Sequence, residues 1–309
     1  MKLSFEEYSK LRKILRTPRD LDRLKYPRGT LYSILIQKRI EIVKSTYYRF
    51  NERIEEIVNY WSRYKRLPRW LRLPPVLKVK LLMKGFGFTD NEIKRALRNP
   101  ELADDLSEVL LRAIKNDYVY SPIAIRIQES RGILAEKAVE HKLKTLCIDF
   151  KREGDLNFKK TPDFYFEEPI RIKDLTLNWI ECKALFGDFE THLRYYRRQY
   201  RDYNKIFGRG AVVYMSGHLN GIKGVLDCEN FRNMYSRALA EMKVYITDNA
   251  DESVAQELNV RFLELKSDPI NSAIRVAEEF SNGIILALHE DYRNLGRVLK
   301  NMGFKVVYL

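Results

Sequence analysis

The sequence predicts a multi-domain protein of the α + α/β class. Three observations lead to this expectation. Helical periodicity dominates the first 130 residues, short apolar strands alternate with helices after residue 122, and a second strand–helix alternation begins after residue 241. With 309 residues, the chain is long enough for more than one hydrophobic core. We therefore expect helical modules at residues 1–72 and 73–121, a mixed sheet flanked by helices at 122–240, and an additional α/β segment at 241–309.

The positive charge of the chain is concentrated near its N-terminus. The whole sequence holds 56 Lys and Arg against 42 Asp and Glu, a net charge of +14. Residues 1–72 contain 19 basic and 8 acidic side chains, a balance of +11, whereas residues 73–309 contain 37 and 34, a balance of +3. A basic segment joined to a nearly neutral body favours an N-terminal contact with a polyanion. The alternative is a charged surface that only keeps the protein soluble.

Composition excludes several classes of protein. Hydrophobic residues make up 45% of the chain and aromatic residues 12%, which excludes intrinsic disorder. No uncharged apolar run approaches the roughly 20 residues that span a bilayer, and charged residues at positions 2, 6 and 7 argue against a secretory signal. The cysteines are isolated, which favours neither disulfides nor a zinc site: Cys147, Cys182 and Cys228. We expect a cytoplasmic protein in a reducing compartment, with no membrane partner.

The first module is predicted to be a helix, a turn and a basic helix. Ser4 followed by Glu7 is typical of a capping box that opens a helix to about Leu15. Residues 26–29 form a turn, and Thr30 is a candidate N-cap for a helix that continues to Tyr64. Five basic residues of this second helix are predicted to contact nucleic acid: Lys38, Arg39, Lys44, Arg49 and Arg53.

The second module repeats the arrangement. A helix at 75–83 is followed by a Gly-rich connection at 85–88, and Thr89 with Glu92 forms a second capping box before a helix at 91–98. Both modules resemble helix-turn-helix units, whose second helix can lie in a DNA groove. Any small helical hairpin has the same pattern, so simple packing is the alternative.

The mixed region carries the elements that would form a site. We expect a helix at 123–147, strands at 163–166, 179–184 and 210–215, and a helix at 189–207. The last segment is expected to contain strands at 244–246, 260–265, 284–288 and 306–309 with helices between them. It contains no Gly-rich phosphate loop, so its role is left open.

The concentrated chemical signal lies on the two central strands. Pro162 precedes Asp163 at the start of one strand, and Glu181 and Lys183 share one face of the next because strand side chains alternate. Pairing of these strands across a connection at 167–178 would bring Asp163 beside Glu181. Two carboxylates, waters and a phosphate oxygen form a suitable shell for Mg²⁺, and Lys183 could orient or deprotonate the attacking water and offset developing charge. The alternative is a surface strand whose charges only solubilise its edge.

Residues on two helices support the functional interpretation. Glu136 lies on the apolar side of its predicted helix, where a carboxylate needs a partner such as a metal ion or the site lysine. Gln199 and Tyr203 stand four apart on one face of the later helix. Basic residues beside that face could contact a phosphate backbone: Arg194, Arg197, Arg198 and Arg201.

These residues also carry a family resemblance. The pairs Pro162-Asp163 and Glu181-x-Lys183 resemble the signature of the PD-(D/E)xK nuclease superfamily, and Gln199-x-x-x-Tyr203 is similar to the accessory helix motif of several branches. The strings Thr161-Pro162-Asp163-Phe164 and Phe186-Gly187-Asp188 resemble the TPD-motif family, the family of the codanin-interacting nucleases.

The resemblance implies helix-turn-helix modules before a divalent-metal-dependent nuclease fold. It implies Asp163 and Glu181 as metal ligands, Lys183 as the catalytic lysine and Glu136 as an auxiliary acid that could also bind the metal. Gln199 and Tyr203 complete the expected catalytic set. It does not cover the segment after about residue 241.

Our leading hypothesis is therefore a Mg²⁺- or Mn²⁺-dependent nuclease that acts on nucleic acid, with DNA favoured over RNA. A nucleic-acid-binding or scaffold protein whose nuclease fold no longer turns over is the second hypothesis. A basic segment that binds a protein partner is the third. Formation of a homodimer is possible, and the sequence identifies no protein partner.

Overall fold

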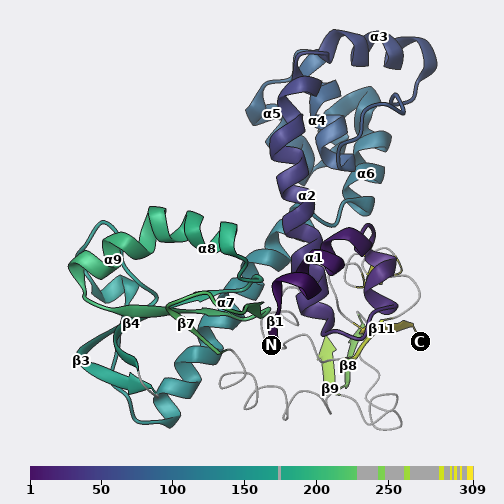
Figure 1. Cartoon of the computed structure of the whole chain (residues 1–309). Coiled ribbons are helices and arrows are strands. Elements are labelled where there is room, and N and C mark those ends of the chain that lie inside the picture. The colour runs from purple at the N-terminus through teal and green to yellow at the C-terminus, as the bar shows by residue number, and fades with distance from the viewer. Residues whose placement is uncertain are drawn as a thin grey trace.

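The computed structural model describes residues 1–172 and 175–227, and beyond them residues 243–247, 261–264, 285–288, 293, 296, 297, 300 and 305–308. Helices occur together with a mixed sheet, so the predicted α + α/β class is confirmed at that level. In Figure 1 a five-stranded sheet lies on the left, a group of helices at the upper right and a second sheet at the lower right. No helix in the described part of the chain combines the length and hydropathy that a bilayer crossing needs.

Helix α1 (Phe5–Ile14) begins with the predicted capping box. The Ser4 side chain accepts the amide N–H of Glu7, and the Glu7 carboxylate accepts the amide N–H of Ser4. A short 3₁₀ helix, Pro18–Asp22, leads to α2 (Arg28–Asn51). The prediction that Thr30 caps this helix is wrong, because Pro27 holds the N-cap position and the buried Thr30 hydroxyl donates to the Ser216 carbonyl at 2.7 Å.

The predicted helix from Thr30 to Tyr64 is broken in two. Helix α2 ends at Asn51, and α3 (Ile54–Tyr64) begins after Arg53, whose backbone leaves the helical region. The break redirects α3 onto α4 (Pro75–Gly85), where a Cβ on Gly85 would lie 2.3 Å from a Val58 methyl group. The packing of α3 against α4 at Gly85 thus overrides the helical periodicity of apolar residues, which continues through the break.

Helices α3 to α6 share one hydrophobic core. Helix α5 (Asp90–Arg98) starts at the predicted Thr89–Glu92 capping box, and a 3₁₀ segment (Pro100–Leu106) precedes α6 (Ser107–Asn116). Fully buried residues from the four helices and from the segment before α4 pack together: Ile57, Leu71, Leu81, Leu82, Met83, Ile93 and Leu110.

The first sheet has the strand order β2-β3-β4-β5-β7. Its strands are Lys151–Arg152, Phe164–Ile172, Leu175–Lys183, Gly210–Tyr214 and Val225–Leu226. The β2-β3-β4 pairs are antiparallel, and the β4-β5-β7 pairs are parallel. Strands β3 and β4 cover most of the predicted 167–178 connection, and the register shifts between Tyr165 and Ile170, an interval that includes Pro169. A proline that lacks an amide N–H fits at such an irregularity.

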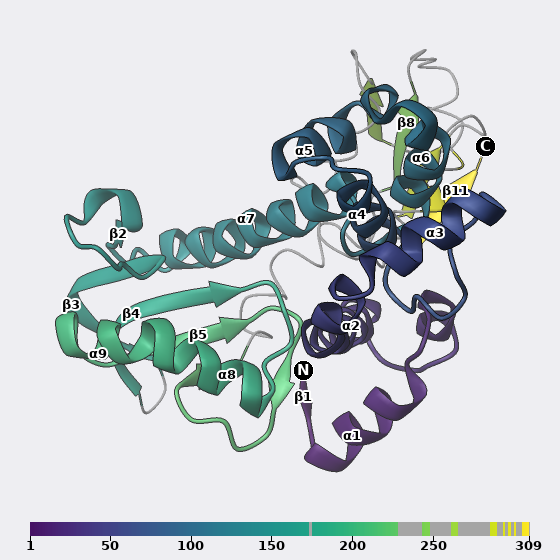
Figure 2. The ribbon, with the colours of Figure 1, turned by 90° about the horizontal axis from the view of Figure 1, so that it is seen from above.

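Helices cover both faces of this sheet (Figure 2). Helix α7 (Pro122–Thr145) packs Ala135, Val139 and Leu143 against one face, which includes Phe164 and Ile180. The opposite face, which includes Trp179, packs against α8 (Phe189–Tyr195), a π-helical turn (Tyr196–Tyr200) and α9 (Arg201–Ile206). Strand alternation therefore directs Glu181 and Lys183, which share the face of Trp179, toward α8 and α9.

The second sheet is parallel, with the order β11-β10-β8-β9. Its strands are Lys243–Thr247, Arg261–Glu264, Ile285–Leu288 and Lys305–Tyr308 in chain order from β8 to β11. The four strands predicted after residue 241 are confirmed, whereas most of the helices predicted between them lie outside the described residues. Strand β1 (Lys2–Leu3) pairs in parallel with β6 (His218–Leu219), so the N-terminus contacts the sheet region.

Candidate active site

The three predicted site residues lie together where β3 begins and β4 ends: Asp163, Glu181 and Lys183. The register pairs Phe164 with Ile180, which places Asp163 opposite Glu181. The Asp163 amide N–H donates to Glu181 Oε2 at 3.3 Å, and Asp163 Oδ2 accepts the Cys182 amide N–H at 2.6 Å. Lys183 donates through its ammonium to Glu181 Oε1. The predicted neighbours therefore form a hydrogen-bonded group.

The two carboxyl groups are held in an environment that disfavours charge. Burial, followed by the Glu181 carboxylate, raises the pKa of Asp163 to about 7. Burial also raises the pKa of Glu181, whose residue is only 2% exposed, although the nearby Lys183 opposes the shift. Burial lowers the pKa of Lys183, but Glu181 and Asp163 outweigh that effect and leave it raised. Two neighbouring acids with raised pKa values are characteristic of functional sites.

Glu136 has a different partner from the one expected. Its Oε2 lies 2.6 Å from Arg152 Nη2 on β2, and its side chain is 33% exposed. The Arg152 guanidinium also stacks over the Phe164 ring at 4.5 Å. Arg152 is thus a partner of Glu136 that the sequence did not predict, and the expected contact with a metal ion or Lys183 stays a prediction. Periodicity could not reveal this arginine, because β2 is only two residues long.

Gln199 and Tyr203 lie on the helix that covers the site face. Tyr203 is buried, with its ring 5.3 Å from Trp179, and burial raises the pKa of its hydroxyl. Gln199 lies within the π-helical turn, and its buried Oε1 has no hydrogen-bond partner among the described residues. Sequence reasoning missed Tyr195 on the same helix, whose ring lies 5.1 Å from Lys183 Nζ. A π-helical turn often marks a functional site.

The predicted nucleic-acid contacts have varied surroundings. Lys38 and Arg39 donate to backbone carbonyls, Lys44 is exposed, and Arg49 donates to the Tyr48 hydroxyl. Arg53 pairs with Glu56 and stacks over Trp70 at 3.9 Å. On the helix beside the site, Arg197 and Arg198 are exposed, Arg194 lies 3.4 Å from the Thr191 hydroxyl, and Arg201 lies 3.9 Å from Asp202. None of these contacts tests binding, so the assignments stay predictions.

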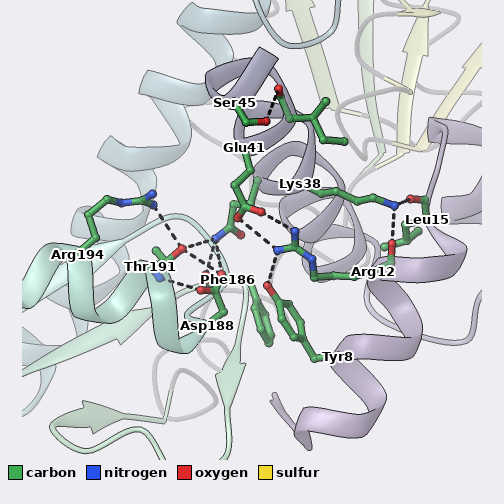
Figure 3. Close-up of polar contacts among 12 residues, drawn as sticks. Tyr8, Arg12, Leu15, Lys38, Glu41, Ser45, Phe186, Asp188, Thr191 and Arg194 are labelled. Atoms are coloured by element: carbon green, nitrogen blue, oxygen red, sulfur yellow. Dashed lines mark hydrogen bonds and ion pairs between the residues drawn. The ribbon is translucent and has the colours of Figure 1, made fainter. Parts of the chain in front are cut away.

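A buried polar cluster connects α2 to the segment that follows Lys183 (Figure 3). The Gln37 amide donates to the Phe186 carbonyl at 2.9 Å, to Asp188 Oδ2 at 3.2 Å and to the Thr191 hydroxyl at 3.2 Å. Asp188 caps α8 by accepting the Thr191 amide N–H at 2.7 Å. We call Gln37, Asp188 and Thr191 the α2 clamp. Sequence analysis missed its long-range partner, although Asp188 belongs to one of the quoted motifs.

The residues present fit a hard divalent cation. Asp163 and Glu181 supply two oxygen-donor carboxyl groups, and a cation there would relieve the unfavourable environment that raises their pKa values. Mg²⁺ is commonly held by one or two carboxylates and completes its shell with waters and substrate phosphate. No cluster of three or more His, Cys, Asp or Glu side chains suited to a metal is found within the described part of the chain. The predicted contribution of Glu136 to metal binding stays a prediction.

Comparison with known proteins provides independent information. A family model described as "Protein of unknown function TPD sequence-motif" matches residues 102–261. The chain is 30% identical over 235 residues to "CDAN1-interacting nuclease 1" of Danio rerio, covering 67% of this chain and 76% of the relative. The proteins of that name from Xenopus laevis and Homo sapiens are each 28% identical, covering 76% and 68% of this chain and 87% and 82% of the relatives. No solved structure matches.

Proposed function

The chain belongs to the TPD sequence-motif family, and from that premise we propose that it is a divalent-metal-dependent nuclease with DNA as the favoured substrate. The observation that carries the proposal is the buried pairing of Asp163 with Glu181 beside Lys183. The relatives' names, which include the word nuclease, support the same class of reaction. The fold assignment to the PD-(D/E)xK superfamily and the helix-turn-helix modules are parts of this proposal.

In this proposal Asp163 and Glu181 hold Mg²⁺ or Mn²⁺. When bound, such an ion polarises the phosphodiester and stabilises the negative charge that develops during hydrolysis. Glu181 is anchored by Lys183, and Asp163 by the Cys182 amide N–H, so both carboxyl groups are oriented by the protein. Preorganised groups of this kind lower the cost of reorganisation during the reaction.

Lys183 acts as a cation in this mechanism. Its raised pKa keeps the ammonium protonated, and its exposed side-chain fraction of 18% leaves it access to a substrate phosphate. The ammonium can therefore offset charge on the phosphate and orient the attacking water. Glu136 orients Arg152, and the buried Gln199 amide oxygen, which has no hydrogen-bond partner among the described residues, is an acceptor for a water molecule in the site.

The proposal is tested by cleavage assays on single-stranded, duplex and branched DNA and on RNA, with Mg²⁺, with Mn²⁺ and with EDTA. We expect metal-dependent cleavage by the wild-type protein. Asp163→Asn and Lys183→Met should each lower the cleavage rate by about 10²- to 10⁴-fold, because each removes a charged group from the reacting region. Thr176→Ser, on the same sheet, is the matched control and should retain full activity.

Two results would contradict the proposal. Cleavage that is unaffected by EDTA would exclude the metal, and cleavage that persists undiminished in both variants would exclude the site. Binding of nucleic acid without cleavage of any substrate would favour the second hypothesis, a scaffold that retains a nuclease fold.

The name of these relatives also describes an interaction with CDAN1. We infer from family membership that this chain has a protein partner in addition to nucleic acid. Affinity purification with the full chain as bait tests this: a specific partner that co-purifies after nuclease treatment of the lysate supports it, and recovery of nucleic-acid-associated proteins alone contradicts it.

A further inference from the structure

A pocket of about 200 Å³ lies between the end of α1, the middle of α2 and the chain that enters α4. We call it the basic pocket. Four of its nine lining residues are basic, and none is acidic: the basic ones are Arg16, Lys38, Arg39 and Arg72. None of these four forms an ion pair with a carboxylate within the described part of the chain. The pocket thus concentrates positive charge that forms no ion pair with a carboxylate of the described residues.

Two of the four cations are held in place by backbone carbonyls. The Lys38 ammonium donates to the carbonyls of Arg12 and Leu15 at 2.5 and 2.9 Å, as Figure 3 shows, and Arg39 Nη2 donates to the Arg16 carbonyl at 2.8 Å. These carbonyls lie at the end of α1, where orphan acceptors attract cations. The arrangement fixes the position of the charge and leaves it unpaired with any anion.

The remaining cations are exposed at the rim. Arg16 and Arg72 are both solvent-exposed, so their guanidinium groups can turn toward a ligand. A guanidinium binds phosphate through two parallel hydrogen bonds, which makes arginine well suited to phosphate recognition. The Asp20 carboxylate, whose charge acts on Lys38, already accepts the amide N–H groups of Arg16 and Thr17. An anionic ligand is therefore the missing counter-charge.

The floor of the pocket is apolar. We call its apolar lining residues the apolar floor: Leu15, Leu35 and Val43 are buried, Ile42 is 47% exposed, and Pro74 completes the set. A free phosphate ion would leave this surface uncovered, whereas a nucleotide would cover it with its base or sugar. A paired base stacked within a duplex cannot enter a concave pocket. The basic side chains and the apolar floor together therefore favour an unpaired nucleotide.

We propose that the basic pocket binds one unpaired nucleotide of a single-stranded nucleic acid, with its phosphate at Arg16 and Arg72 and its base or sugar on the apolar floor. The proposal rests on the proposed nuclease function and narrows its substrate to one that has an unpaired stretch. Helix α2 carries both Lys38 of the pocket and Gln37 of the α2 clamp, so the pocket is joined directly to the segment that follows Lys183.

The test is fluorescence anisotropy of a short labelled oligothymidylate with the full-length protein in EDTA. The Arg16→Gln/Arg72→Gln variant removes the rim, and Arg23→Gln/Lys25→Gln removes the same charge from exposed positions in the same segment but outside the pocket. The rim variant should lose about ten-fold or more in affinity, and its salt slope should fall by about 0.7 per lost phosphate contact. The control should change affinity by less than about two-fold and leave the slope unaltered.

Ile42→Ser should weaken binding without changing the slope, because it alters only apolar contact.

Several results would overturn the proposal. Equal losses in the rim variant and the control would mean that only diffuse charge matters. A duplex of the same length that binds as tightly, with the same sensitivity, would exclude selection of unpaired nucleotides. Thymidine monophosphate that binds as tightly as the oligonucleotide would indicate a site for free nucleotides. A Glu- and Phe-containing peptide that binds more tightly would indicate a protein ligand.

Circular dichroism of each variant separates loss of binding from loss of folding. Because binding is measured in EDTA, it does not depend on turnover. If the pocket variants bind normally and metal-dependent cleavage is intact, the pocket proposal is wrong and the proposed function stands. If the pocket binds the oligonucleotide but no substrate is cleaved, the pocket proposal stands and the proposed function is wrong.

Discussion

The candidate active site and the basic pocket both gather charge, but they arrange it in opposite ways. In the site, acids and an ammonium lie within hydrogen-bond distance of one another and are largely buried. In the basic pocket, all the charged side chains are cations, which are held by backbone carbonyls or left exposed, and no carboxylate lines the pocket. Paired and desolvated charges are suited to holding an ion and reacting groups, whereas unpaired exposed charges are suited to binding an anion.

One helix joins the two regions. Adjacent residues of α2 point to different partners, since Gln37 donates to the segment after Lys183 and Lys38 donates to the end of α1. The α2 clamp therefore ties the predicted binding region to the predicted reacting region through buried hydrogen bonds. Binding and chemistry should be separable by mutation even though one helix serves both.

The largest expected effects separate these roles in cleavage kinetics. Glu181→Gln should lower kcat by about 10²- to 10⁴-fold with little change in KM, because it acts on the reacting region. The Arg16→Gln/Arg72→Gln variant should raise KM for single-stranded substrate by about ten-fold with kcat nearly unchanged, because it acts on binding. Steady-state cleavage assays measure both. If the two variants affect the same parameter, the division of roles is wrong.

A smaller effect is expected at the α2 clamp. Gln37→Glu replaces an amide donor with a carboxylate, so the clamp loses the hydrogen bonds donated to the Phe186 carbonyl and to Asp188 and gains like-charge repulsion. We expect the free energy of unfolding to fall by about 1–3 kcal/mol, as measured by urea denaturation. Ser45→Ala is the control on the same helix, because among the described residues the exposed Ser45 hydroxyl donates only to the Ile42 carbonyl in its own turn. A clamp variant as stable as the control would mean that the two regions are joined by other contacts.

The smallest effect concerns acid stability where the N-terminus meets the sheet region. Burial lowers the pKa of His218 on β6, and its Nε2 has no hydrogen-bond partner among the described residues. The unfolded chain therefore binds this proton more readily, and stability should be lost as the pH falls below about 6.5, the ordinary histidine value. The neighbouring Lys2 and N-terminal amine act in the same direction, whereas Asp227 opposes them.

Urea denaturation across this pH range tests the last expectation. His218→Gln should make the decline in unfolding free energy shallower, and the remaining slope should come from other groups, including His192, whose pKa burial also lowers. A slope identical to that of the wild-type protein would mean that His218 titrates alike in the folded and unfolded chain.

Local sequence determined the elements and much of the candidate site. The capping boxes at Ser4 and Thr89 occur as predicted, because each depends on residues three positions apart. Strand alternation placed Glu181 and Lys183 on one face, and antiparallel pairing placed Asp163 opposite Glu181. These features follow from backbone geometry that few long-range contacts can change.

Tertiary structure decided what depends on distant partners. The Thr30 hydroxyl donates to the Ser216 carbonyl and does not cap its helix. Glu136 pairs with Arg152. Gln37 donates to Asp188, about 150 positions away along the chain. The break between α2 and α3 and the π-helical turn near Gln199 likewise have no signal in hydrophobic periodicity. Periodicity reports which face of an element is buried, but only packing determines which side chain meets a buried polar group. The sequence by itself therefore indicated the residues of the candidate site, and the fold alone revealed how α2 connects them to the basic pocket.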